Sequence, residues 1–315
     1  MKNKRSIFLK KKVLPVLMAA ILIFAFSSCN KSGEVNELND NTGGYNVTLK
    51  DSYDREVTLD KEPERVVSVA PSITEIIFAL GQQGKLVGRT DYCDYPEEVQ
   101  NIESIGNIDQ PNVEKIVELQ PDIVITSTIF TKEMLQKLEE AGVKVAIFQA
   151  EKDFEGVYDI IENIGLLLNA RDEANSVVAE MKEKVELVKS KVDGLEKPSV
   201  YYVMGYGEYG DYTAGRDTFI ARMIEMAGGK NAADDVEGWK YNIESLLEKD
   251  PDILICSKFY ASKAGIESAD GYKELSAVRG GKLFEIDNNM LDRQGPRVAD
   301  GLLELARIIH PEAFE

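Results

Sequence analysis

The chain has 315 residues, a length that fits two domains of ordinary size, each with its own core. With 43% hydrophobic and 29% charged residues, it has the composition of a globular protein, which excludes a largely disordered or collagen-like chain. The formal net charge of −18, without a cluster of basic and aromatic residues, disfavours nucleic acid as a partner.

The first 45 residues differ in composition from the rest of the chain. Six basic residues lie before an apolar run at residues 13–26, which is shorter than the roughly 20 residues of a permanent membrane span. This order predicts an export signal at residues 1–28. Residues 29–45, rich in Asn, Gly, Ser and acidic residues, predict a flexible tether. Because the signal removes six of 37 basic residues and none of 55 acidic ones, the mature charge is 31 minus 55, or −24.

Histidine and cysteine are scarce. The single histidine, His310, lies at the end of the last expected helix, and Cys93 and Cys256 are the only cysteines after Cys29. A Ser-His or Cys-His catalytic set, or a bare metal site with several His and Cys ligands, is therefore disfavoured. We expect a non-catalytic protein with no cofactor, no resident metal and no disulfide framework.

Two stretches that lie 130 residues apart are alike. Residues 112–125 are NVEKIVELQPDIVI and residues 242–255 are NIESLLEKDPDILI, identical at seven of fourteen positions. Each predicts a short helix, a Pro-Asp break and a β-branched strand. A supersecondary unit that occurs twice predicts two similar α/β lobes, with a ligand cleft between them.

The expected elements alternate between strand and helix in both lobes. A hairpin at 47–49 and 57–59 is followed by strands at 65–69, 86–88, 123–126 and 143–148 and by helices at 72–80, 113–119, 132–141 and 154–168. Ser72 and Glu75 have the spacing of a capping box. In the second lobe we expect strands at 199–203, 253–255 and 283–286 and helices at 218–227, 243–249 and 297–309. This order predicts a mostly parallel sheet flanked by helices in each lobe.

One long helix is predicted between the lobes, at residues 171–192. Its apolar residues recur at helical spacing and it contains no Gly or Pro. Twenty-two residues at about 1.5 Å each give roughly 33 Å, enough to connect two lobes and restrict their motion. The predicted organisation is an N-terminal lobe at 46–169, a rigid inter-lobe helix at 170–193 and a C-terminal lobe at 194–315.

The loop after strand 199–203 is rich in glycine and tyrosine. Its sequence GYGEYG at 205–210 matches G-x-G-x-x-G, but residues 211–217 separate it from the next helix, which disfavours a dinucleotide site. Tyrosine combines a flat apolar face with a hydroxyl group, which suits a large, partly polar ligand. The candidate aromatic ligand residues are Tyr206, Tyr209 and Tyr212 here, Trp239 in the same lobe and Tyr92 in the first lobe.

Several stretches together resemble the substrate-binding lipoproteins of bacterial ABC importers for metal chelates, the family that takes up iron-siderophores, heme and cobalamin. The matching stretches are RVVSVAPSITE at 65–75, VG at 87–88, YP at 95–96, PDIV at 121–124, AGV at 141–143, EMAGGKN at 225–231 and GPR at 295–297. The resemblance implies two α/β lobes joined by a rigid helix, a shallow cleft and little closure. It also implies lipidation at Cys29, anchoring outside the cytoplasm, and a monomer that delivers its ligand to a permease with its ATPase.

The resemblance also implies roles for individual residues. Glu75 and Glu225 are expected to dock onto permease arginines, and Tyr92 and Trp239 stand where cobalamin-binding members place aromatic residues. Ile108 stands where that subgroup often has tryptophan, so we favour an iron-siderophore or another iron complex, with a corrinoid or heme as the alternative. An extracellular chelatase ranks last because no paired-carboxylate motif is evident. Arginines suited to an anionic siderophore or to heme carboxylates are Arg89, Arg216, Arg293 and Arg297.

Overall fold

The computed structural model describes residues 45–127, 131–149 and 151–315. The predicted export signal, the lipidation site Cys29 and all but the last residue of the predicted tether lie outside these ranges. Among the described residues, no helix combines the length and the apolar character needed to cross a bilayer.

The N-terminal lobe contains a hairpin and a four-stranded parallel sheet. Strands β1 (Val47–Lys50) and β2 (Glu56–Leu59) pair antiparallel. The parallel sheet has the order β4-β3-β5-β6 and consists of β3 (Val66–Ser68), β4 (Leu86–Arg89), β5 (Ile123–Thr126) and β6 (Val145–Ile147). The helices of this lobe are α1 (Pro71–Ala79), α2 (Val113–Glu118), α3 (Lys132–Glu140) and α4 (Phe154–Leu167).

The C-terminal lobe contains a second parallel sheet, with the order β10-β9-β7-β8. Its strands are β7 (Ser199–Val203), β8 (Lys230–Asn231), β9 (Ile253–Ser257) and β10 (Leu283–Ile286), and its helices are α6 (Phe219–Met226), α7 (Ile243–Lys249), α8 (Ser262–Ser268), α9 (Ser276–Arg279), α10 (Asn289–Asp292) and α11 (Val298–Ile309). When the strands are numbered along the chain within each sheet, both sheets have the order 2-1-3-4. The prediction of two parallel α/β lobes is confirmed.

The repeated sequence has the same structural role in both lobes. The side chain of Asn112 caps α2 by accepting a hydrogen bond from the Lys115 amide at 3.0 Å, and Asn242 caps α7 through the Ser245 amide at 3.1 Å. After the Pro-Asp break, the carboxylate of Asp122 accepts hydrogen bonds from the amides of residues 64 and 65, just before β3. Asp252 accepts one from the amide of residue 199 in β7 at 2.8 Å. The repeat therefore joins the third strand of each sheet to the first.

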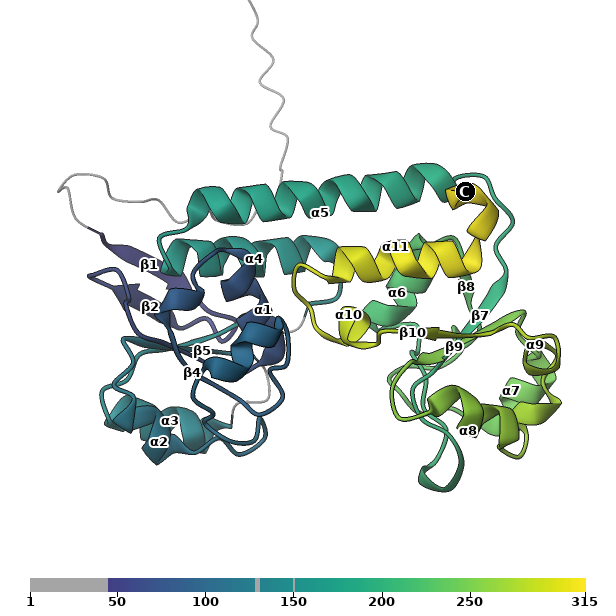
Figure 1. The fold of residues 1–315 in the computed structure, drawn as a ribbon, viewed down its shortest axis with the longest axis horizontal. Helices are drawn as coiled ribbons and strands as arrows, with labels where there is room; N and C mark the ends of the chain where they lie inside the picture. The colour runs from purple at the N-terminus through teal and green to yellow at the C-terminus, as the bar shows by residue number, and fades with distance from the viewer. Residues whose placement is uncertain (1–44, 128–130, 150) are drawn as a thin grey trace, which may run out of the picture. The chain divides into compact units, whose positions relative to one another are not determined.

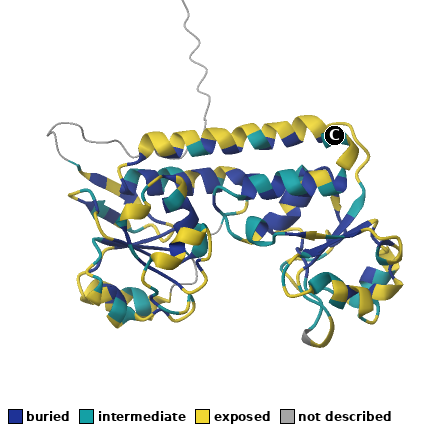
Figure 2. Ribbon diagram, in the orientation of Figure 1, coloured by how far each residue is buried: buried dark blue, intermediate teal, exposed yellow. Residues whose placement is uncertain are grey.

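Helix α5 (Arg171–Val192) begins and ends at the predicted residues. It lies alongside α4 and α11 (Figure 1). Its buried residues recur every three or four positions on the side that faces these helices, and the opposite side is exposed (Figure 2). The buried residues are Ala174, Val178, Met181, Val185, Val188 and Val192.

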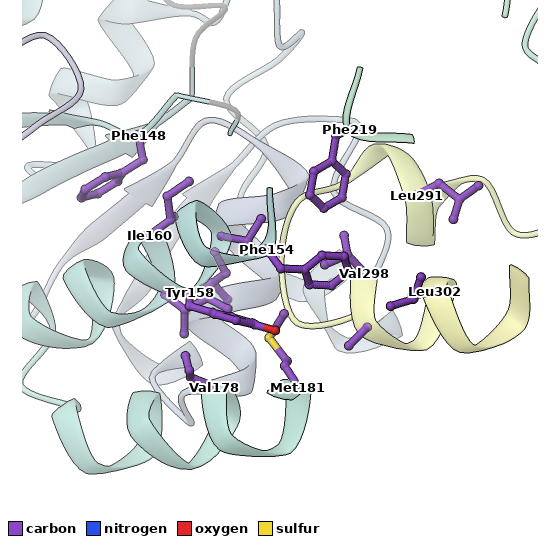
Figure 3. Close-up of a cluster of buried hydrophobic side chains, with 14 of the residues drawn as sticks. Phe148, Phe154, Tyr158, Ile160, Val178, Met181, Phe219, Leu291, Val298 and Leu302 are labelled. Carbon is purple, nitrogen blue, oxygen red and sulfur yellow. The ribbon is translucent and has the colours of Figure 1, made fainter. Parts of the chain in front are cut away.

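One apolar core is shared by the two lobes. It runs from β1 through α1, α4, α5 and α6 to α11 without interruption, and smaller clusters lie on the other face of each sheet. Phe154 of α4 and Phe219 of α6 are in contact across the lobes, with ring centroids 5.3 Å apart (Figure 3). Figure 3 also shows Tyr158 of α4 and Met181 of α5 in this cluster. The expectation that each lobe has a core of its own is therefore wrong for the inner faces.

Two local predictions are corrected by the structure. Helix α1 begins at Pro71, and its N-cap, Ala70, makes no side-chain capping bond, so Ser72 and Glu75 do not form a capping box. Strand β8 and helices α8 to α10 were not predicted, because elements of two to seven residues are too short for a periodic pattern.

Candidate functional site

The candidate aromatic residues follow the carboxyl ends of the parallel strands. Tyr92 follows β4, which is the second strand of its lobe, and Trp239 follows β8, the second strand of the other lobe. Tyr206 and Tyr212 follow β7. In open parallel sheets, ligands bind at the carboxyl ends of the strands, where the chain connections diverge. The structure therefore places Tyr92 and Trp239 at equivalent positions, next to the edges where ligands bind in such sheets.

Exposure distinguishes these aromatic residues from one another. Tyr92 is 50% exposed and Trp239 is 41% exposed, so neither is a core residue and both rings are accessible to a ligand. Tyr206 and Tyr212 are partly buried. The Tyr206 ring meets Tyr272 edge-on at 5.9 Å, so at least part of its role is structural. The side chain of Tyr209 lies outside the described set.

Sequence analysis missed a further aromatic residue at a strand end. Tyr260 comes shortly after β9, the third strand of the C-terminal lobe, and is 99% exposed. It has a positive φ of 58°, which is unfavourable for a bulky residue. No pattern in the sequence marks this tyrosine, because its exposure depends on how the loop leaves the sheet.

Glu75 is buried and holds two arginines of the other lobe. Arg297 donates from Nε and Nη2 to the two carboxylate oxygens of Glu75, both at 2.7 Å, and Arg293 donates from Nη1 at 3.0 Å. Glu75 is 4% exposed. Arg293 also donates to Asp94, and the Arg297 guanidinium lies 4.0 Å from the ring centroid of Tyr95. We call the ion pairs of Glu75 with Arg293 and Arg297 the clasp.

The electrostatics of the clasp keep both arginines charged. Burial lowers the pKa of Arg297, but the hydrogen bond and charge of Glu75 outweigh this effect and raise the pKa above its ordinary value. For Arg293, burial likewise lowers the pKa. The hydrogen bonds and charges of Asp94 and Glu75 outweigh burial, so the pKa of Arg293 lies above its ordinary value. The clasp is thus a buried cluster of charges between the lobes, in which the carboxylate and the two guanidinium groups offset the cost of one another's burial.

A second pair of hydrogen bonds lies beside the clasp. The Gln294 side chain accepts from the Glu151 amide at 2.6 Å and donates to the Glu151 carbonyl at 2.7 Å. Glu151 comes after β6 and Gln294 after β10, the fourth strand of each lobe. Equivalent segments of the two lobes therefore bind each other directly.

The four arginines predicted to hold an anionic ligand are engaged within the protein. Arg293 and Arg297 belong to the clasp. Arg89 is 8% exposed and donates to the Thr90 carbonyl and to the Gln100 side chain, while its Nε has no partner. Arg216 is exposed but pairs with Glu237 at 2.7 Å. Each of these charges already has a protein partner or is buried, and the anion site that the sequence suggested stays a prediction.

The two predicted docking glutamates differ in accessibility. Glu225 is exposed on α6, whereas the carboxylate of Glu75 is enclosed by the clasp. Docking through Glu75 would require the clasp to open, and its docking role stays a prediction. Sequence analysis found the repeat but overlooked the glutamates within it. Glu114 and Glu244 occupy one repeat position, in the first turns of α2 and α7, and Glu118 and Glu248 occupy another; all four are exposed.

Three cavities of the described residues lie away from the aromatic loops. One of about 540 Å3 borders Pro198, Phe284 and His310, and others of about 370 and 340 Å3 lie beside β2 and between α5 and α11. No predicted ligand residue lines any of the three, so the inter-lobe ligand cleft stays a prediction. His310 contacts the Gly228 carbonyl at 3.0 Å. Within the described ranges, no group of three His, Cys, Asp or Glu side chains is placed to hold a metal ion.

Two α/β lobes with the same parallel strand order, linked by one long helix and a common core, define a two-lobe solute-binding protein. Residues 66–290 match the model of the periplasmic binding protein family, and the chain belongs to this family. It is 32% identical over 309 residues to the uncharacterized ABC transporter substrate-binding lipoprotein YvrC of Bacillus subtilis strain 168, and the match covers 95% of this chain and 96% of YvrC.

Two further proteins extend the comparison. The cobalamin-binding protein of Halobacterium salinarum strain R1 is 30% identical over 284 residues, which cover 86% of this chain and 76% of that protein. The periplasmic heme-binding protein RhuT of Roseiflexus sp. RS-1, in its apo form, superimposes with a TM-score of 0.73 at 26% identity. That superposition covers 79% of this chain and 99% of RhuT.

Proposed function

We propose that this protein is an extracytoplasmic solute-binding protein that captures a metal chelate and delivers it to an ABC permease. The similarity to YvrC along nearly the whole chain is the observation that carries this proposal. Exposed aromatic residues at equivalent strand ends of two lobes, Tyr92 and Trp239, supply the surface that a large ligand with flat apolar faces needs. We propose no catalytic step, because the relatives are solute-binding proteins.

The ligand belongs to the class of iron-siderophores and other iron complexes, corrinoids and heme. The relatives include a cobalamin-binding and a heme-binding protein, which favours these chelates alongside the iron complex that the sequence suggested. A corrinoid gains support from the Halobacterium salinarum relative, which matches over more of this chain than RhuT does.

We propose that the chain acts outside the cytoplasm as a lipid-anchored monomer. The basic and apolar start of the sequence, followed by Cys29, and the similarity to a lipoprotein support the anchor. Its partners are a permease and the associated ATPase, as the resemblance to ABC importer components implies.

Docking onto permease arginines requires acidic side chains that are exposed on the surface of this protein. Glu225 meets this requirement, while Glu75 meets it only if the clasp opens. Glu114 and Glu244 offer a matched pair, one on each lobe, in the first turns of α2 and α7, and Glu118 and Glu248 offer a second pair one turn later. We therefore propose that the two lobes dock through Glu114 and Glu244, with Glu225 as a further contact.

An uptake assay tests docking. A strain that depends on this protein for chelate uptake is complemented with the double variant Glu114→Ala and Glu244→Ala, with Glu225→Ala, and with the exposed α5 control Glu183→Ala. We expect the double variant to lose uptake while the purified protein keeps its ligand affinity. Normal uptake by the double variant excludes docking through this pair.

Ligand binding tests the function itself. The chain has one tryptophan, Trp239, whose fluorescence directly reports on the proposed site. Full-length protein in lipid nanodiscs is titrated with ferric siderophores, hemin and cyanocobalamin, with inner-filter controls. Saturable quenching with a Kd below about 1 μM, or roughly −8 kcal/mol, supports the proposal, and absence of binding to all three classes overturns it.

A further inference from the structure

The arginines near the aromatic loops are not available to a ligand. Arg293 and Arg297 share the buried carboxylate of Glu75, and Arg293 also binds Asp94. Arg216 pairs with Glu237, which lies two residues from Trp239. An anion at this surface would have to displace a carboxylate that is already hydrogen-bonded, so each arginine contributes little net attraction.

The loops that carry the exposed aromatics are strongly acidic. Residues 90–111, which contain Tyr92, have six acidic residues and no basic one, although three of the six, Asp91, Asp94 and Glu103, lie within ion-pair distance of basic residues outside this segment. Residues 204–217 and 232–242, which contain the C-terminal aromatics, have three acidic residues and one basic residue each, and Asp234 and Asp235 share Lys249. The basic residue of the first of these two segments is Arg216, already paired, and that of the second is Lys240, for which no ion pair is found within the described ranges. The net charge of the loops stays negative after these pairs are counted.

The sign of this local charge decides which chelates are attracted. At physiological ionic strength, charges are screened over about 8 Å, so the carboxylates of the loops act on a ligand that touches Tyr92 or Trp239. A ferric tris-catecholate with three negative charges, or heme with two propionates, meets repulsion there. A neutral corrinoid or a neutral or positively charged ferric tris-hydroxamate does not. Charge therefore distinguishes chelates that are alike in size and in their flat apolar faces.

We propose that the site selects neutral or positively charged metal chelates and discriminates against polyanionic ones. This inference rests on the proposed function and narrows its ligand class. Tyr92 and Trp239 supply apolar contact, and the acidic loops supply the discrimination. Glu237 contributes by neutralising Arg216, whose positive charge would otherwise attract an anion.

The test compares chelates of one metal that differ in charge. Full-length protein in phosphatidylcholine nanodiscs, with empty nanodiscs as the blank, is examined by equilibrium dialysis. The ligands are a positively charged ferric tris-hydroxamate and a ferric tris-catecholate, with cyanocobalamin and hemin as a second neutral and anionic pair. We expect the tightest neutral or cationic ligand to bind at least about tenfold more tightly than either anion. The difference should shrink as salt rises.

A charge variant identifies the source of the discrimination. Glu237→Gln frees Arg216, so the affinity for both anions should rise severalfold relative to the affinity for cyanocobalamin. Glu183→Gln makes the same charge change on the exposed side of α5 and should alter neither.

The outcomes separate this inference from the proposed function. Tight binding of hemin or the tris-catecholate, stronger than that of every neutral or cationic chelate, overturns the charge selection and leaves a solute-binding protein. An unchanged preference in Glu237→Gln overturns the role of the acidic loops. Failure of all four ligands to bind means that the proposed function itself is wrong.

Discussion

The two lobes have the same strand order and the same capped repeat, yet their first helices carry glutamates in opposite environments. Glu75 on α1 is buried by two arginines of the other lobe, whereas Glu225 on α6 is exposed. Equivalent places in a repeated fold therefore do not imply equivalent roles. Glu75 joins the lobes, and Glu225 is free to contact another molecule.

The comparison is also the reason for proposing that docking uses the repeat. Glu114 and Glu244 lie in helices whose caps and strand contacts are the same in both lobes. The glutamates of α1 and α6 lack this symmetry, because the clasp exists on one side only. Under the proposed function, a partner that binds both lobes in the same way would use glutamates at matched positions, and the repeat supplies two such pairs, Glu114 with Glu244 and Glu118 with Glu248.

Replacing the two glutamates gives the largest expected contrast. Glu75→Ala leaves Arg293 and Arg297 largely buried without their carboxylate, which should lower the free energy of unfolding by about 3–5 kcal/mol. Glu225→Ala removes an exposed charge and should change it by less than about 0.5 kcal/mol. Urea denaturation followed by circular dichroism measures both. Equal effects would show that the clasp does not stabilise the protein.

The shared core predicts that the lobes unfold together. Phe154→Ala and Phe219→Ala each remove a buried ring and should cost about 3–5 kcal/mol. Because the two rings are in contact across the lobes, the double variant should cost about 1 kcal/mol less than the sum. Calorimetry should show one transition for the wild type. Additive losses with two separate transitions would mean that the lobes are independent.

The repeat predicts equal effects in the two lobes, in contrast to the glutamates. Asn112→Ala and Asn242→Ala each remove one helix cap, and each should lower the free energy of unfolding by about 1 kcal/mol. Asn→Gly at the same positions should cost only a few tenths of a kcal/mol. Denaturation midpoints of the four variants measure this, and a clearly larger loss in one lobe would contradict equivalence.

Features set by local pattern were predictable from the sequence. The bounds of α5 follow from apolar residues at helical spacing and the absence of Gly and Pro, and β5, β7 and β10 follow from β-branched and aromatic runs bounded by Pro, Gly and polar residues. The repeat predicted a shared topology because a chain that duplicates a unit duplicates its contacts. Exposure of Tyr92 and Trp239 agrees with their predicted place in polar loops.

Features set by distant contacts were not predictable. The residues that bury Glu75 lie 218 and 222 positions away in the chain, and no local pattern brings them together. The same holds for the contact of Phe154 with Phe219. The arginines were read as ligand residues because their charge was visible in the sequence and their partners were not.

Acidic residues in the two lobes should show opposite pH dependence, the smallest effect expected here. Burial, and then the charges of Asp153 and Asp159, raise the pKa of Glu151, so its ionisation opposes folding as pH rises through the folded pKa. Hydrogen bonds from the Ser276 hydroxyl at 2.6 Å and amide at 2.8 Å lower the pKa of Asp250, whose contribution is present above its ordinary pKa and lost as pH falls.

Amide substitutions make this difference measurable. Glu151→Gln should stabilise the protein at pH 7, with a gain that disappears below pH 4.5, the ordinary pKa of glutamate. Asp250→Asn should destabilise it at pH 7, with a loss that fades as pH falls below 3.8 towards the lowered folded pKa. Denaturation across this pH range gives both signs. A loss for Glu151→Gln at pH 7 would show that its hydrogen-bonded surroundings favour the charged form, which would make the two lobes alike at these positions.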